Sequence, residues 1–235
     1  TGGMINQEMG EDSTSRTHLH YGVIHENSAF LIESHLWKTD GFDSIKRSTS
    51  DTGFDKNDLV FKLRLNSDVD KEGIYHELNL KYQGSDESSD RSYVGLSNAD
   101  FKKQPHSRYG LTAYDNIDSG HDTFSMNYII DLGDVEFSAT IYKNDFSRNW
   151  FKVDKIDNKE VYGIGSGINN IIDAANSGNT NALAILQGTN PQEIEIKLKN
   201  NNRSYLSEGN DLKVQYNTDK QTLTLGYRTT EDKED

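Results

Sequence analysis

Hydrophobic and polar residues alternate at every second position over nine segments of the chain. A period of two predicts β-strands with one apolar and one polar face. The alternation is clear where Phe124, Met126, Tyr128 and Ile130 are interleaved with polar residues such as Ser125. The predicted strands are residues 3–10, 17–24, 29–38, 59–66, 74–84, 122–131, 135–150, 205–217 and 221–230.

The segments between these strands differ in length in a regular way. Short links at 25–28, 67–73, 132–134 and 218–220 take turns with longer excursions at 11–16, 39–58, 85–121 and 151–204. If consecutive strands pair as hairpins, all short turns lie at one end and all long loops at the other, as in outer-membrane barrels. The predicted fold class is therefore all-β, as an antiparallel up-and-down transmembrane β-barrel segment of about nine strands.

The two faces of the predicted strands have the polarity that a barrel wall requires. A strand in lipid needs apolar side chains outward, whereas the lumen accepts polar ones. We predict one continuous outward band formed by Phe124, Met126, Tyr128, Ile130, Val135, Phe137, Ala139 and Ile141, with Glu136, Ser138 and Thr140 inward. A soluble antiparallel sandwich also alternates, but it would pack this band against a second sheet.

Composition narrows the classes of protein. A hydrophobic content of 33% is low for a soluble core of 235 residues, and a mean hydropathy of −0.82 is equally low. A net charge of −13 excludes a nucleic-acid partner, because phosphate binding requires a basic face. The absence of cysteine excludes disulfides and thiol chemistry. No cofactor is predicted.

The ends of the chain suggest a piece of a larger molecule. Single-chain bacterial barrels have an even number of strands, which nine strands cannot provide. Thr1 does not begin a signal peptide. We expect residues 1–235 to be a partial β-barrel domain, with strands missing on the C-terminal side and a domain missing on the N-terminal side. The sheet should then be open, with unpaired edges along its first and last strands.

The longest excursion, 151–204, has helical patterns of its own. Ser166 is predicted to cap a helix with an apolar stripe, and Gly178 to end it. The stripe consists of Ile168, Ile171, Ile172 and Ala175. A second short helix is predicted over 181–187, stopped by Gly188. These helices would either pack the loop against its neighbours or form a lid.

Four segments resemble a known family. Residues 92–101, SYVGLSNADF, followed by Arg108 and Tyr109, resemble the tyrosine-x-glycine-leucine-threonine-x-alanine-aspartate-phenylalanine segment of TonB-dependent receptors of the ferric citrate receptor type. Residues 140–154, TIYKNDFSRNWFKVD, resemble that family's strand leading into its next outer loop. Residues 201–209 and 225–228 resemble the two strands after it.

This resemblance implies a 22-stranded barrel with a plugged lumen. Such a receptor takes up a ferric chelate (a siderophore or ferric citrate) or another small nutrient across the bacterial outer membrane. It is energised by the TonB complex through a TonB box and plug that the family carries N-terminal to the barrel. Two other classes stay open. One is a passive outer-membrane porin or adhesin. The other, an outer-membrane hydrolase, lacks support because the glycines around Ser166 do not have nucleophile-elbow spacing. We expect no enzymatic activity.

Ligand-binding candidates follow from the chemistry of an anionic chelate. Guanidinium groups bind carboxylates bidentately, so arginines facing the vestibule are required. Four arginines stand near predicted strand-loop junctions, each close to an aromatic residue. The predicted ligand-binding residues are Arg91, Tyr93, Arg108, Tyr109, Arg148, Trp150, Arg203 and Tyr205. The alternative is that the aromatics form the interfacial girdle and the arginines pair with lipopolysaccharide or loop carboxylates.

Histidine supplies the competing hypothesis of a metal site. His18 and His20 share one face of a predicted strand and would need a third ligand from a neighbouring strand to chelate zinc or copper. The remaining histidines show no cluster in the sequence. We therefore predict no metal site.

Overall fold

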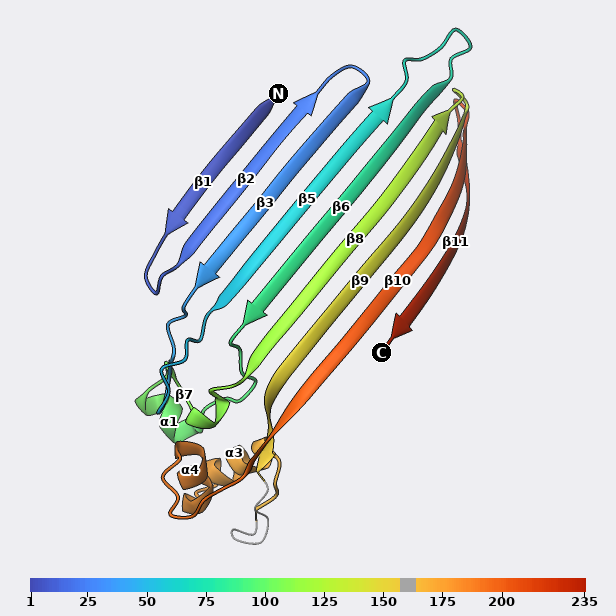
Figure 1. Cartoon of the computed structure of the whole chain (residues 1–235). Coiled ribbons are helices and arrows are strands. Elements are labelled where there is room, and N and C mark those ends of the chain that lie inside the picture. Colours follow the sequence, from blue (N-terminus) through green and yellow to red (C-terminus); the bar gives the residue numbers. More distant parts are fainter. Residues whose placement is uncertain (157–163) are drawn as a thin grey trace.

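A computed structural model describes residues 1–156 and 164–235. Nine strands form one antiparallel sheet in which neighbours in sequence are neighbours in space (Figure 1). The strands are β1 (Gly2–Met9), β2 (Ser15–Ile24), β3 (Ser28–Thr39), β5 (Phe54–Asn66), β6 (Tyr75–Ser89), β8 (Asn116–Asp131), β9 (Val135–Ile156), β10 (Ile196–Asn217) and β11 (Thr222–Glu234). All nine predicted strands are confirmed.

Several strands continue toward the loops beyond their predicted bounds. The largest extension is that of β10, which begins at Ile196 and pairs there with Ile156 of β9. Backbone hydrogen bonding between strands does not require alternating side chains. The strands can therefore continue beyond the segments whose alternating pattern predicted them. The ordered sheet has β1 at one edge and β11 at the other, and among the described strands these two do not pair with each other. The predicted open sheet is confirmed.

The register separates an apolar face from a polar face, as predicted. One apolar row crosses six strands in the order Leu65, Leu78, Tyr128, Ala139, Leu212 and Tyr227. One polar row crosses the same strands in the order Arg64, Asn79, Asn127, Thr140, Asp211 and Arg228. The eight band residues share the apolar face, and Ile141 is 44% exposed. The described residues form no second large sheet over this face, which excludes the sandwich.

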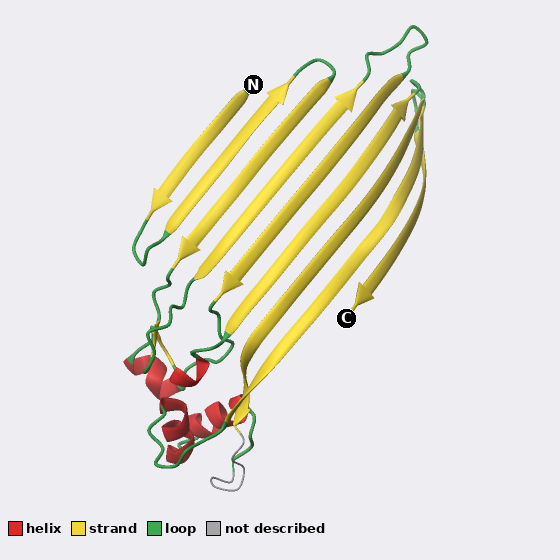
Figure 2. Cartoon of the chain, viewed as in Figure 1, coloured by secondary structure: helices red, strands yellow, loops and turns green. Residues whose placement is uncertain are grey.

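The chain buries its hydrophobic core outside the sheet. Short turns lie at one end of the sheet, and the helices of the described residues lie at the other, beside the long loops (Figure 2). We call the loops 40–53, 90–115 and 164–195, together with the end of β9, the loop domain. Its core consists of Val94, Tyr109, Val153, Ile156, Ile168, Ile171, Ala182, Ile185 and Leu186. The core joins the excursions 90–115 and 151–195, and loop 40–53 is attached to this unit by backbone pairing of Ser44 and Ile45 with Ser107 and Arg108 at the loop end of the sheet.

The loop domain contains more structure than predicted. Its elements are β4 (Ser44–Ile45), α1 (Asn98–Lys103), β7 (Ser107–Arg108), the 3-10 helix η1 (Gly110–Thr112), α3 (Ile168–Asn176) and α4 (Thr180–Gln187). Only α3 and α4 were predicted, and both are confirmed. The parallel pairing of β4 with β7 joins two excursions that the sequence pattern leaves separate. No helix among the described residues is long and apolar enough to span a membrane.

The predicted helix ends are right in all but one case. Gly178 follows α3 with φ of +89°, and Gly188 ends α4 with φ of +65°, a left-handed conformation that suits glycine. The Ser166 cap is wrong, because Gly167 is the N-cap residue of α3 and no side chain caps it. No N-cap was predicted for α4. In the structure Asn179 caps it by accepting a hydrogen bond from the Ala182 amide.

Candidate functional site

A cationic and aromatic cluster occupies the polar face of β9 and β10 at the loop end of the sheet. The side chains of Phe146, Arg148, Trp150 and Lys152 are two residues apart along β9 and therefore share this face. Pairing with β10 sets Arg203 directly opposite Arg148, and Tyr205 opposite Phe146. Like charges directly opposite each other destabilise a sheet, so this pair of arginines costs stability unless an anion joins it.

The two arginines differ in the hydrogen-bond partners of their guanidinium groups. Arg203 donates to Glu234 at 2.7 Å, an ion pair that is largely exposed to solvent. The side chain of Arg148 makes no hydrogen bond or ion pair with the residues that the structure describes, and its Nε is buried without an acceptor. A buried donor without a partner costs about 1–3 kcal/mol. An anionic oxygen placed between the strands would satisfy it through a charge-assisted hydrogen bond.

Loop residues close over this cluster. Lys152 Nζ lies 4.1 Å from the ring centroids of both Tyr93 and Trp150, and these two rings meet edge-on at 5.9 Å. Tyr93 donates its hydroxyl to the carbonyl of Val153 at 2.9 Å, and burial raises the pKa of that hydroxyl. The loop 90–115 thus reaches onto the polar face of β9. Trp150 Nε1 is buried without an acceptor, a second donor that a ligand oxygen would satisfy.

An aromatic row continues from the arginine pair down the polar face. The Phe146 ring lies 5.9 Å from Tyr205 and 5.9 Å from His121. The sequence interpretation included Tyr205 and missed Phe146, His121 and Lys152. Phe146 and Lys152 lie an even number of residues from Arg148 and Trp150 on the same strand, so they share a face with them. The alternation along the strand was therefore enough to predict both. His121 required the register between β8 and β9, which pairs it with Phe146.

The remaining predicted residues lie in the loop domain. Tyr109 is only 1% exposed. Its hydroxyl donates to Asp100 at 2.8 Å and accepts from the Ser97 amide, and burial raises its pKa. It therefore offers no surface to a ligand. Arg108 donates to the carbonyls of Asp90 and Thr112, while burial lowers the pKa of its guanidinium. Tyr109 and Arg108 thus stabilise the loop domain. Arg91, in contrast, is exposed at the start of loop 90–115.

The segment that carries the family resemblance builds the core of this domain. Ser97 caps α1 by accepting from the Asp100 amide at 3.2 Å. The Asp100 carboxylate accepts from Tyr109 and also from Gln187 of α4 at 2.8 Å, which ties α1 to α4. Asp115 accepts from the Val153 amide at 2.7 Å and so ties the same loop to β9. The matched residues thus help to hold Tyr93 against Trp150 and Lys152 of β9.

We expect the loop domain to loosen in acid through Asp100. Burial alone would raise the pKa of this carboxyl, but hydrogen bonds from Tyr109 and Gln187 outweigh burial and lower it below the ordinary 3.8. A lowered pKa stabilises the folded domain above pH 3.8 and loses this contribution as the pH falls through the folded value. Pepsin should therefore cut the loop domain increasingly below that pH. In Asp100→Asn the rise in cutting below that pH, measured relative to an unfolded substrate that reports pepsin's own pH dependence, should be smaller than in wild type. An unchanged profile would contradict the assignment.

A wide concavity lies elsewhere, toward the turn end of the polar face. It encloses about 790 Å³ and is lined by three basic residues, Lys62, Arg64 and Lys81, together with apolar ones. It is wide open to solvent because the sheet is not closed. The arginine pair does not line it.

The histidines correct one prediction. His18 and His20 do share a strand face, and the neighbouring strand β3 brings Glu33 and His35 to His18, while His20 is not part of this group. Of the remaining histidines, His35 thus belongs to a cluster that the sequence pattern did not reveal. The pattern did not reveal it because His18 and His35 are brought together only by the register of β2 with β3.

Comparisons with known proteins identify the fold and leave the family open. No protein-family model matches the chain, and no curated protein sequence does. Among solved structures, the crystal structure of the siderophore receptor PiuA from Acinetobacter baumannii matches with a TM-score of 0.59 over 99% of this chain, at 9% sequence identity. The chain spans 30% of the length of that receptor. The likeness therefore concerns the fold: an open antiparallel sheet that corresponds to part of a siderophore receptor.

Proposed function

We propose that the chain is part of a TonB-dependent receptor in the bacterial outer membrane, which takes up a ferric chelate or another small nutrient. The observation that carries the proposal is the arginine pair of β9 and β10, beside the contact of Tyr93 with Trp150, in a sheet with the fold of a siderophore receptor. An apolar face for lipid and a polar face for the lumen support the membrane location.

The proposed ligand is anionic. Arg148 and Arg203 offer guanidinium groups to carboxylate or hydroxamate oxygens, and Trp150 offers an indole N–H. Tyr93 and Tyr205 supply flat apolar surface on either side of these donors. Because Tyr109 and Arg108 serve the loop domain, we omit them from the proposed contact set. Arg91 stays in it as an exposed cation at the rim.

The proposed partners follow from the same account. Energy would come from the TonB complex acting on regions outside these residues. Basic side chains at the rim would meet lipopolysaccharide, and the loop domain would fold over the bound ligand. A passive porin or adhesin remains the alternative, and it requires neither a selective anion site nor an energy source.

Transport assays separate these possibilities. We expect the full-length protein, expressed in a receptor-deficient host, to take up iron-55 from a panel of anionic ferric chelates, and uptake to stop when TonB is deleted. Purified protein should bind the same chelate in a fluorescence titration. Uptake that is linear in concentration and indifferent to TonB would indicate a porin, and no uptake or binding across the panel would refute the receptor.

A further inference from the structure

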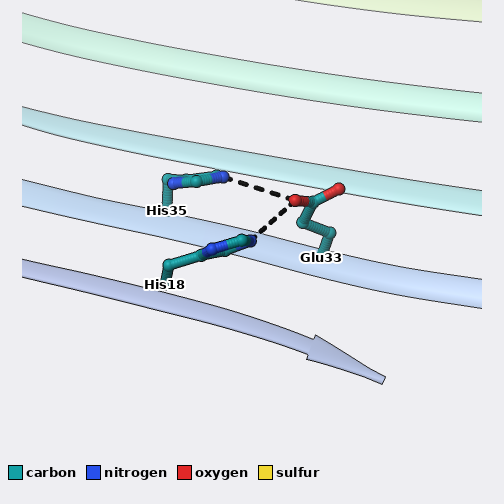
Figure 3. A group of neighbouring side chains, drawn as sticks. All are labelled: His18, Glu33 and His35. Carbon is teal, nitrogen blue, oxygen red and sulfur yellow. Dashed lines mark hydrogen bonds and ion pairs between the residues drawn. The ribbon is translucent and has the colours of Figure 1, made fainter. Parts of the chain in front are cut away.

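Three metal-ligating side chains converge on the polar face between β2 and β3 (Figure 3). Glu33 Oε1 lies 2.7 Å from His18 Nε2 and 3.4 Å from His35 Nε2. Each residue contributes one ligand atom, and the three atoms lie within 4.8 Å of one another. This cluster is far along the sheet from the arginine pair, on the other side of β5, β6 and β8.

The strands themselves determine this arrangement. His18 and His35 are directly opposite each other in the register of β2 with β3. Their rings stack with centroids 3.9 Å apart and planes within 13°. Glu33 is two residues from His35 and so shares its face. A paired sheet holds Cβ atoms of opposite residues about 4.5–5.5 Å apart, so the donors stay close without help from a flexible loop.

We propose that His18, Glu33 and His35 form a binding site for a divalent transition-metal ion, with Zn²⁺ as its preferred occupant. Two imidazoles with one carboxylate suit zinc, copper and nickel better than magnesium or calcium, which favour oxygen ligands. Ligands of tetrahedral zinc at about 2.0–2.1 Å are separated by about 3.3 Å. The contact between His35 and Glu33 already has that separation, and the shorter contact of His18 with Glu33 needs to open by about 0.6 Å. One of the two stacked rings must also turn so that both Nε2 lone pairs point at the ion.

The chemistry of binding is a replacement of hydrogen bonds by coordination. In the metal-free state His18 Nε2 is hydrogen-bonded to Glu33 Oε1 at 2.7 Å, and His35 Nε2 makes a longer contact of 3.4 Å with the same oxygen. A metal ion takes the Nε2 lone pair, and the ring proton then resides on Nδ1. The positive charge of the ion then balances the negative charge of the Glu33 carboxylate, in place of the imidazole N–H. No side chain has to leave the face.

Access and a fourth ligand are both provided. The three side chains are 22%, 30% and 33% exposed, so an ion reaches them from the water side. His20 lies on the same face opposite Glu33, and its ring centroid is 5.6 Å from that of His18. A rotation of His20 would complete a tetrahedron, and water would otherwise fill that position.

Zinc titration of the full-length protein tests this site independently of chelate binding. Calorimetry in detergent should give one saturable site in wild type, and Co²⁺ in place of Zn²⁺ should produce the intense visible bands of a tetrahedral imidazole site. Loss of a supporting partner costs metal sites about 10- to 100-fold in affinity, so loss of a ligand in His35→Gln or Glu33→Gln should exceed 100-fold. His106→Gln, which removes an exposed histidine beside Asp43, is the matched control.

Two results would overturn the proposal. One is wild-type protein without a saturable site or without tetrahedral Co²⁺ bands, which decides the matter even if the variants fail to fold. The other is affinity that His35→Gln leaves unchanged in a protein with normal heat-modifiable mobility. Neither result bears on the arginine pair, so the proposed receptor function stands or falls separately.

Discussion

Replacing Arg148 and Arg203 together by glutamine is expected to abolish most of the affinity for an anionic ferric chelate. A hydrogen bond to a charged group contributes about 1.5–3 kcal/mol, or roughly 10- to 150-fold for each arginine. The double change should therefore cost at least about 100-fold in Kd. Ligand titration of the purified protein measures it, with heat-modifiable mobility as the check on folding.

The folded state should tolerate these changes, because the variant removes two like charges that face each other across β9 and β10. Arg228→Gln is the matched control. It removes an arginine from the same polar face, where Arg228 already pairs with Asp211 at 2.8 Å. Equal loss of affinity in the control would show a general charge effect, and unchanged affinity in the double variant would remove both arginines from the site.

Arginine at Ile141 is expected to block membrane assembly, whereas arginine at the adjacent Thr140 should be accepted. Ile141 lies on the apolar face, 44% exposed with no protein layer over it among the described residues. An arginine near the bilayer midplane of a barrel costs about 2–4 kcal/mol. Thr140 lies on the polar face opposite Asp211, so its replacement gains an opposite charge across the strands.

Urea titration of both variants in lipid vesicles measures this difference. We expect Ile141→Arg to lower the unfolding free energy by about 2–4 kcal/mol and Thr140→Arg to change it by less than about 1 kcal/mol. Equal destabilisation by both substitutions would mean that the two faces meet similar surroundings, which a barrel wall does not allow.

The strands were predictable because their signal is local. Period-two alternation needs only neighbouring residues, and it found all nine strands in the correct order. The helix of residues 168–176 was predictable for the same reason, since its apolar spacing and Gly178 lie within one short segment. Ser166 was predicted as its N-cap, but the N-cap is the next residue, Gly167. The sequence pattern does not fix the first residue of a helix to within one position. Only backbone geometry distinguishes Ser166 from Gly167.

The sites were less predictable because they depend on pairing between strands. Arg148 and Arg203 were both candidates, yet nothing in the sequence places them opposite each other. The same holds for His18 and His35, separated by a hairpin whose register determines whether their rings meet. The burial of Tyr109 was unpredictable for a related reason, since an aromatic near a strand end can face a vestibule or fill a core. Burial in the loop domain decides between the two.

The orientation of the sheet is the central claim, and a cysteine scan along β9 tests it most directly. The chain contains no cysteine, so each single substitution from Phe137 to Tyr142 carries a unique label site. Spin labels in vesicles should alternate at every residue. Those at 137, 139 and 141 should collide with oxygen in lipid, and those at 138, 140 and 142 with a water-soluble nickel complex. Uniform accessibility to the nickel complex at all six positions would contradict a membrane-spanning wall.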